Sequence, residues 1–175
     1  MLVIENLRRG ILLFATLLAM DAGQANAVTG FDTAPAPAST DDPYDAGVAA
    51  FEAEDWQGVL DRMSEALEAR PWLDNAHNLM GFAYRKLGDY PAALDAYGKA
   101  LTLNPYNRGA LEYLGEAYLE LDRPNDAKAT LDRLAGACEM LAHGGVDPLA
   151  TCHEWQELSE AYDAYVAKDR SASAE

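Results

Sequence analysis

A period of 34 residues runs through the middle of this chain and limits what it can fold into. The spacing recurs at Gly, Tyr, Ala and Pro positions: Gly47, Gly81 and Gly115; Tyr84 and Tyr118; Ala66 and Ala100; Pro71 and Pro105. The clearest unit, residues 74–107, contains two helical patterns joined by a tight turn. One such helix pair cannot bury its apolar faces alone. A fixed period of this length therefore indicates a stacked array of helix pairs.

The helical pattern is continuous from Pro43, and no stretch shows strand alternation over a useful length. It predicts helices at about 43–53, 56–69, 74–87, 90–103, 108–121 and 124–142. A last helix follows at about 149–168, with one apolar face and a polar tail at 169–175. Asp42 can cap the first helix, and Asp55 and Asp89 can cap the helices that follow their turns. We therefore expect an all-α fold of three helix-turn-helix repeats and a capping helix.

The repeats resemble the tetratricopeptide repeat, or TPR. That family has Leu-Gly and then Tyr in the first helix, and Ala, an aromatic residue, Ala and Pro in the second. The middle repeat (74–107) matches with Met80-Gly81, Tyr84, Ala93, Tyr97, Ala100 and Pro105, and has His77 where an aromatic or aliphatic residue is usual. The third (108–141) matches with Leu111, Leu114-Gly115, Tyr118, Ala127, Leu131 and Leu134. The first (about 40–73) is the weakest, with Gly47, Ala50, Trp56, Val59, Met63, Ala66 and Pro71. The resemblance implies a TPR solenoid over residues 43–168, in which these residues pack the helix pairs.

The first 27 residues have the pattern of a secretory signal peptide. Two arginines precede a mostly apolar run at 11–20, and a small-x-small motif at 25–27 predicts cleavage between Ala27 and Val28. We therefore expect a periplasmic or secreted protein, exported by the Sec or the twin-arginine route. An uncleaved membrane anchor is the alternative. Residues 28–42 are rich in Ala, Pro, Ser and Thr and are expected to be a flexible linker.

The formal net charge of −16 disfavours two classes of partner. An acidic surface repels the phosphate backbone of nucleic acids, and it also repels anionic lipid. The chain has only three histidines, no Gly-rich phosphate loop and no Gly-x-Ser-x-Gly motif. We therefore expect neither enzymatic activity nor a cofactor.

Cys138 and Cys152 are the only cysteines. In an exported protein, two cysteines at facing helix ends predict a disulfide, which would fix the last helix to the array. Exported bacterial TPR proteins with a Cys-bearing capping helix are similar. The alternative is a zinc site formed with His143 and His153, and with it a small metal-dependent enzyme. The spacing Cys-x4-His-x8-Cys-His lacks the usual paired-cysteine knuckle.

The TPR resemblance implies a binding groove lined by the first helix of each repeat. Its expected positions are Tyr44, Val48, Phe51, Asn75, Asn78, Phe82, Arg85, Glu112 and Glu116, with Tyr113 beside them. Family members that grip a peptide carboxylate use Lys, Asn and Arg there. Asn78 fits that set, whereas Glu112 and Glu116 do not.

We therefore expect a protein or peptide partner with apolar anchors and basic side chains. The chain would act as an interaction module in the assembly or scaffolding of envelope complexes. The alternative is a self-associating structural unit, whose groove is filled by another copy or by its own leader.

Overall fold

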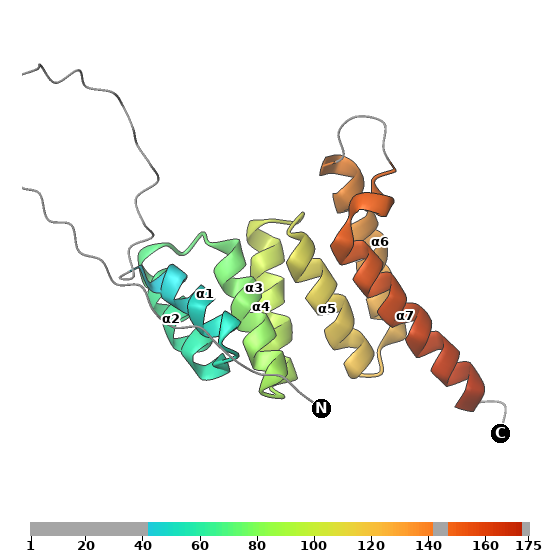
Figure 1. Cartoon of the computed structure of the whole chain (residues 1–175), viewed down its shortest axis with the longest axis horizontal. Coiled ribbons are helices and arrows are strands. Elements are labelled where there is room, and N and C mark those ends of the chain that lie inside the picture. The colour runs from blue at the N-terminus through green and yellow to red at the C-terminus, as the bar shows by residue number, and fades with distance from the viewer. Residues whose placement is uncertain (1–41, 142–146, 173–175) are drawn as a thin grey trace, which may run out of the picture. The chain divides into compact units, whose positions relative to one another are not determined.

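The computed structural model describes residues 42–141 and 147–172, all within the compact unit Pro35–Glu175. The described residues form seven α-helices, one short 3-10 helix and no strand: α1 (Pro43–Glu52), α2 (Trp56–Ala69), α3 (Asp74–Lys86), α4 (Tyr90–Leu103), α5 (Arg108–Glu120), α6 (Pro124–Leu141), η1 (Leu149–Thr151) and α7 (His153–Ala172). Figure 1 shows these helices following one another from α1 to α7. The expected all-α fold is confirmed. The expected signal peptide, the cleavage site at Ala27 and Val28, the linker up to residue 41, and His143 lie outside the described residues.

Three helices begin where the predicted capping residues lie: Asp42, Asp55 and Asp89 each accept a hydrogen bond from a backbone N–H two or three residues further on, at 2.9–3.1 Å. Asn107, which was not predicted as a cap, accepts one from the N–H of Ala110 at 2.9 Å. Such bonds satisfy N–H groups that have no partner within the helix. The helix starts can therefore be read from local sequence.

Two expectations about the C-terminal helix are wrong. Residues 149–151 form the separate η1 turn, so α7 begins only at His153. The polar tail was expected from residue 169, but α7 continues to Ala172. The last turns contain Ala, Lys and Arg, which are good helix formers and let the helix extend without an apolar face to bury.

The turn inside each repeat adopts the same left-handed conformation. Glu54, Gly88 and Asp122 are spaced by 34 residues and have φ angles of 56°, 81° and 58°. Only the middle repeat has glycine at this position, where a side chain is costly. The repetition of this geometry shows that the turn follows from the helix pairing as well as from the residue type.

The first helices of the repeats form a continuous series. α1 contacts α3, α3 contacts α5, and α5 contacts α7, while α2, α4 and α6 pack against their own partners within each repeat. α7 also contacts α6. The final helix therefore occupies the place that the first helix of a fourth repeat would take.

Two glycines allow close approach between these helices. A Cβ atom on Gly81 would lie 2.5 Å from the buried ring of Tyr97, which confirms close packing within the second repeat. At Gly115 the nearest atoms belong to Leu158 of α7, also at 2.5 Å, rather than to the paired helix α6. Gly115 therefore makes room for the final helix.

Candidate binding groove

Four aromatic side chains form a row across the first two repeats and into the third. The ring centroids of Phe51 and Phe82 lie 4.9 Å apart, and those of Phe82 and Tyr113 lie 4.8 Å apart. Trp56 lies beside this row, 5.7 Å from Phe51 and 5.5 Å from Phe82. All four side chains are half-buried, so each keeps part of its surface open to solvent. We call Phe51, Trp56, Phe82 and Tyr113 the aromatic row.

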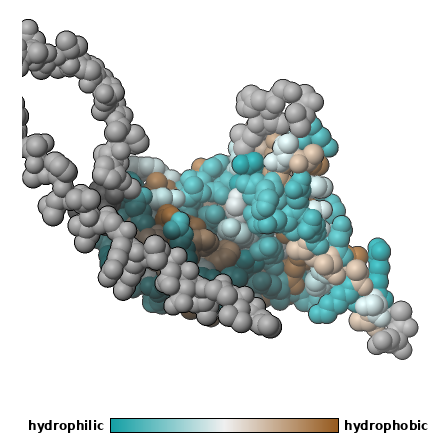
Figure 2. All heavy atoms as spheres, in the orientation of Figure 1, coloured by the Kyte–Doolittle hydropathy of each residue, from teal (hydrophilic) through white to brown (hydrophobic). Residues whose placement is uncertain are grey.

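The aromatic row borders an open hollow that we call the aromatic cleft. This cleft has a volume of about 440 Å³ and is lined by Phe51, Glu52, Glu54, Trp56, Phe82 and Lys86. Figure 2 shows mostly hydrophilic residues on the face drawn, with hydrophobic residues gathered in patches between them. Hydrophobic side chains that border a concave surface are typical of sites that bind apolar groups of a partner.

A second hollow, the α7 cleft, has a volume of about 550 Å³ and adjoins the first at Lys86. Its walls come from the ends of α3 and α5 and from the second half of α7: Arg85, Lys86, Glu116, Leu119, Glu120, Ala161, Ala164, Tyr165 and Lys168. The Tyr165 hydroxyl donates a hydrogen bond to Asp122, which raises the pKa of Tyr165 to about 12. Sequence reasoning treated α7 as a cap and missed its part in this groove. The apolar face of α7, which includes Ala161 and Tyr165, is the sequence feature that could have indicated this contribution.

Arg85 was expected to be exposed in the groove, and this is wrong: the residue is only 7% exposed. Its guanidinium pairs with Glu116 at 2.6 Å and with Glu120 at 3.4 Å. It also lies 5.1 Å from the ring centroid of Phe82 and 5.7 Å from that of Tyr113. Two carboxylates and two rings thus surround the charge, which joins α3 to α5 and is not free to attract a partner.

The groove positions given to Asn78 and Glu112 are also wrong, because both residues are buried. The Asn78 amide nitrogen packs next to Gly109, 3.0 Å from where a Cβ of that residue would lie. Glu112 faces α7 and forms a side-chain hydrogen bond with Glu157. Burial, this hydrogen bond and the neighbouring carboxylates raise the pKa of Glu112 to about 9, so Glu112 is protonated at neutral pH.

The other expected groove residues remain accessible. Tyr44, Val48, Phe51, Phe82 and Glu116 are half-buried, and Asn75 is exposed. Tyr44 and Val48 pack against the core of the first two repeats, whereas Phe51 and Phe82 belong to the aromatic row.

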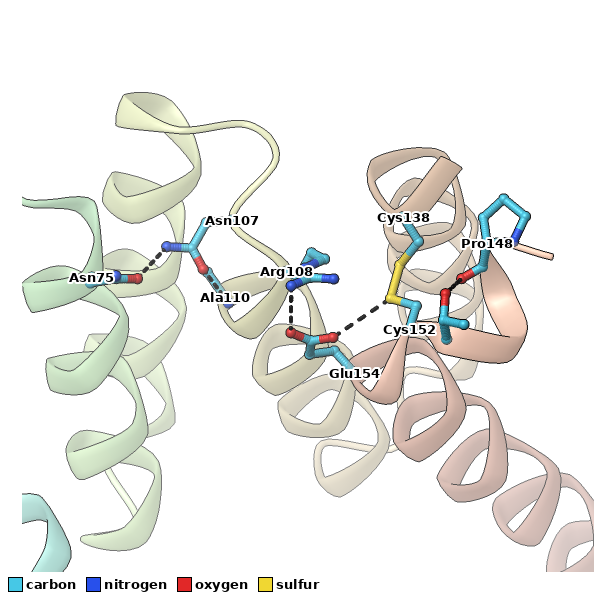
Figure 3. A network of polar contacts seen from close by, with 9 residues as sticks. Asn75, Asn107, Arg108, Ala110, Cys138, Pro148, Cys152 and Glu154 are labelled. Atoms are coloured by element: carbon cyan, nitrogen blue, oxygen red, sulfur yellow. Dashed lines mark hydrogen bonds and ion pairs between the residues drawn. A yellow bond between two sulfur atoms is a disulfide. The ribbon is translucent and has the colours of Figure 1, made fainter. Parts of the chain in front are cut away.

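Asn75 accepts a hydrogen bond from Asn107 at 2.9 Å, and Asn107 accepts one from the N–H of Ala110 (Figure 3). Asn107 and Asn104 also donate to Asp74, both at 2.8 Å. This polar network ties the second repeat to the start of the third. Asn75 is thus engaged at a repeat junction.

Two contacts fix the start of α7. The sulfur atoms of Cys138 and Cys152 lie 1.99 Å apart, which is a disulfide distance, and Figure 3 shows this bond between the end of α6 and the start of α7. Close by, Arg108 of α5 pairs with Glu154 of α7 at 3.4 Å.

The alternative zinc set shares both cysteines of the disulfide pair. The described parts of the chain hold no group of three or more His, Cys, Asp or Glu side chains placed to bind a metal. No helix in those parts has both the length and the apolar character needed to cross a bilayer.

Residues 75–107 match the family model of the tetratricopeptide repeat. The second helix pair, α3 and α4, thus has the sequence pattern of one tetratricopeptide repeat. No curated protein sequence matches the chain. The TPR assignment agrees with the expected resemblance, and the solved structures described next extend it from one repeat to the fold.

Three solved structures show the likeness in fold. The TPR2B domain of yeast Sti1, in its complex with pHsp70, has 17% identity and a TM-score of 0.63, and the match covers 72% of this chain and 94% of that one. The first TPR of Spaghetti (RPAP3), bound to the HSP90 peptide SRMEEVD, has 18% identity and a TM-score of 0.57 over 71% and 90% of the two chains. SycD, a type III secretion translocator chaperone of Yersinia enterocolitica, has 12% identity and a TM-score of 0.60 over 75% and 86%. The chain therefore has the fold of a TPR solenoid.

Proposed function

We propose that this protein is an exported, non-enzymatic interaction module that binds a peptide or protein segment along its groove. The aromatic row is the observation that carries this proposal. Its rings contact one another at 4.8–5.7 Å and still keep open surface next to two adjoining clefts. Rigid aromatic rings provide large apolar contacts at a low cost in conformational entropy, and they are enriched among residues that dominate binding energy.

The TPR neighbours support the same kind of function. The Sti1 domain was solved with pHsp70, and the Spaghetti domain with an HSP90 peptide. These proteins show that a helical array of this fold can hold a peptide. By the same principle, we propose that this chain holds a peptide.

The partner segment is expected to have apolar anchors and at least one basic side chain. The anchors would pack on Phe51, Trp56 and Phe82. Glu52 and Glu54 line the aromatic cleft together with Lys86 and form no ion pair with another described residue, so the lining has a net charge of −1 and attracts a basic group. Glu52 and Glu54 are the carboxylates that would attract the basic group, because Glu112 is buried and Glu116 is paired with Arg85.

We place this function outside the cytoplasm, as part of the assembly or scaffolding of envelope complexes. The signal-peptide pattern of residues 1–27 supports export. The Cys138–Cys152 pair supports it as well, because disulfides persist in oxidising compartments.

Capture of crosslinked partners from an envelope fraction tests the proposal. Trp56→Leu removes a ring of the aromatic row but keeps an apolar side chain, and it should weaken capture by about tenfold, as loss of a central aromatic residue typically does. Trp72→Leu is the matched control, because Trp72 is 65% exposed and lies outside both clefts. Equal capture by both variants would rule out the groove as the binding surface.

Light scattering of the purified protein tests self-association in the same groove. A partner-binding module with an open groove should give the mass of one chain. A stable dimer that Trp56→Leu dissociates would instead show that a second copy fills the groove.

A further inference from the structure

Few Lys and Arg side chains in the described part of the chain are left without an ion pair, and two of them lie in the same cleft. Seven basic side chains pair with carboxylates within the array: Arg62, Arg70, Arg85, Lys99, Arg108, Arg123 and Lys128. Among the described residues, the remaining basic side chains, Lys86, Arg133, Lys168 and Arg170, form no ion pair. Two of these four, Lys86 and Lys168, line the α7 cleft.

The charge balance in the α7 cleft differs from that of the rest of the surface. The whole chain has a net charge of −16. Inside the cleft, the carboxylates of Glu116 and Glu120 both pair with Arg85, whose single positive charge balances only one of them. With Lys86 and Lys168, the groups that line the cleft have a net charge of +1 in an otherwise acidic protein. Such a local inversion attracts acidic groups and repels basic ones.

The remaining walls of the cleft suit the apolar stem of a side chain. Leu119, Ala161 and Ala164 are apolar, and the ring of Tyr165 adds aromatic surface while its hydroxyl is bound to Asp122. An Asp or Glu side chain would thus find carbon atoms for its methylene groups and two ammonium groups for its carboxylate.

We propose that the α7 cleft binds an acidic side chain, Asp or Glu, of the partner segment, whose carboxylate interacts with Lys86 and Lys168. This inference rests on the proposed function, since it concerns one contact of the same bound segment. It makes α7 part of the recognition surface as well as the end of the array. With Glu52 and Glu54 at the α1 end of the groove, it also sets the orientation of the segment. The basic group lies over the aromatic cleft, and the acidic group lies against α7.

Selection of a displayed random dodecapeptide library against the full-length, oxidised protein tests the proposal. The test variant is Lys86→Gln with Lys168→Gln, which removes the two positive charges of the cleft. The matched control is Arg133→Gln with Arg170→Gln, which removes two charges that likewise form no ion pair and that line neither cleft, whereas Lys86 also lies 5.0 Å from the ring centroid of Phe82. All four side chains are exposed, so circular dichroism should show the same helical content in each protein.

We expect peptides enriched on the wild type and on the control to contain Asp or Glu, and those enriched on the test variant to lack this preference. In titrations with one enriched peptide, Asp or Glu→Gln should weaken binding to the wild type and to the control by about fivefold to tenfold, as for a charge-assisted contact. The same change should leave binding to the test variant unaltered.

Two outcomes would overturn the inference, and they can be told apart. If acidic residues are equally preferred by the test variant, or by none of the proteins, the α7 cleft does not bind an acidic side chain, although the groove still binds peptides. If no peptide is enriched on any of the proteins, the proposed function fails and the inference fails with it.

Discussion

Arg85 of α3 and Glu116 of α5 form an ion pair of 2.6 Å that joins the second repeat to the third. The side chain of Arg85 is only 5% exposed, and Glu120 approaches the same guanidinium nitrogen at 3.4 Å. A residue that the TPR register places in the binding groove is therefore used to hold two repeats together. The groove takes its charge from the residues next to Arg85, notably Lys86.

Arg85→Gln should lower the free energy of unfolding by about 2–3 kcal/mol, because it leaves a partly buried carboxylate pair without its cation. Urea denaturation followed by circular dichroism measures this change. Arg62→Gln is the control, since Arg62 and its partner Glu65 are both more than half exposed. The control should change stability by less than about 0.5 kcal/mol. Similar losses in both variants would mean that Arg85 contributes no more than a surface ion pair.

Gly115→Ala should disturb the docking of α7. The added Cβ would lie 2.5 Å from Leu158, so the helices must separate or the leucine must move, at a cost of about 1–3 kcal/mol. Gly136→Ala in α6 meets no atom within 4 Å and should instead stabilise the protein by about 0.5–1 kcal/mol. Thermal unfolding compares the two. Opposite signs are expected, and a stabilising Gly115→Ala would contradict the close contact.

Gly88→Ala isolates the left-handed turn. No atom lies within 4 Å of the added Cβ, so its cost comes from the backbone angle alone, about 1 kcal/mol. Gly98→Ala, also free of contacts but inside α4, should stabilise the protein by about 0.5–1 kcal/mol. Chemical denaturation of the two variants should therefore shift the midpoint in opposite directions.

Stability should fall as the pH rises through the range in which Glu112 titrates. The pKa of Glu112 is about 9 in the folded protein, against an ordinary value of 4.5, so the folded state holds a proton that the unfolded state has lost. The stabilisation is complete below pH 4.5 and is lost progressively up to about pH 9. Glu116, Glu154 and Glu157 are the carboxylates that face this group.

The melting temperature should be lower at pH 9 than at pH 5.5, because the folded state gives up the proton on Glu112 over this range. Glu112→Gln mimics the protonated side chain and should reduce this difference. Calorimetry at the two pH values provides the measurement. If the variant and the wild type show the same pH dependence, other carboxylates are responsible.

Replacing the cysteine pair by Cys138→Ser with Cys152→Ser should cost about 3 kcal/mol, the chain-entropy value for a loop of about 15 residues. The loss should appear first in the protection of α7 amides from hydrogen exchange. If the native protein contains this disulfide, a thiol assay under non-reducing, denaturing conditions should detect no free thiol. Two free thiols in periplasm-derived protein would contradict it.

Local features of the sequence predict the helices well. The Asp caps and the prolines mark helix ends through residues close by in the sequence, and the 34-residue period gives the length of each repeat. The aromatic positions of the groove, Phe51 and Phe82, follow from the same register and indeed contact each other.

The wrong expectations about groove residues involve contacts between segments distant in sequence. The burial of Glu112 depends on α7, which begins about 40 residues later in the chain. The burial of Arg85 depends on Glu116 and Glu120 of the next repeat. The TPR sequence pattern assigns a side chain to a face of its helix, but it does not show which other segment covers that face. Lys86 was not predicted as a groove residue for the same reason. Its position in the groove depends on where the two clefts meet.

The position of α7 has a consequence for how proteins built from such repeats could gain a repeat. Since α7 packs on α5 and α6 as the first helix of another repeat would, a duplicated copy of residues 108–141 inserted before residue 142 would present the same two surfaces to it. Both the glycine that receives Leu158 and the cysteine that meets Cys152 are contained in that unit. The contacts that dock α7 at Gly115 and Cys138 are thus encoded within a single repeat, the one next to it.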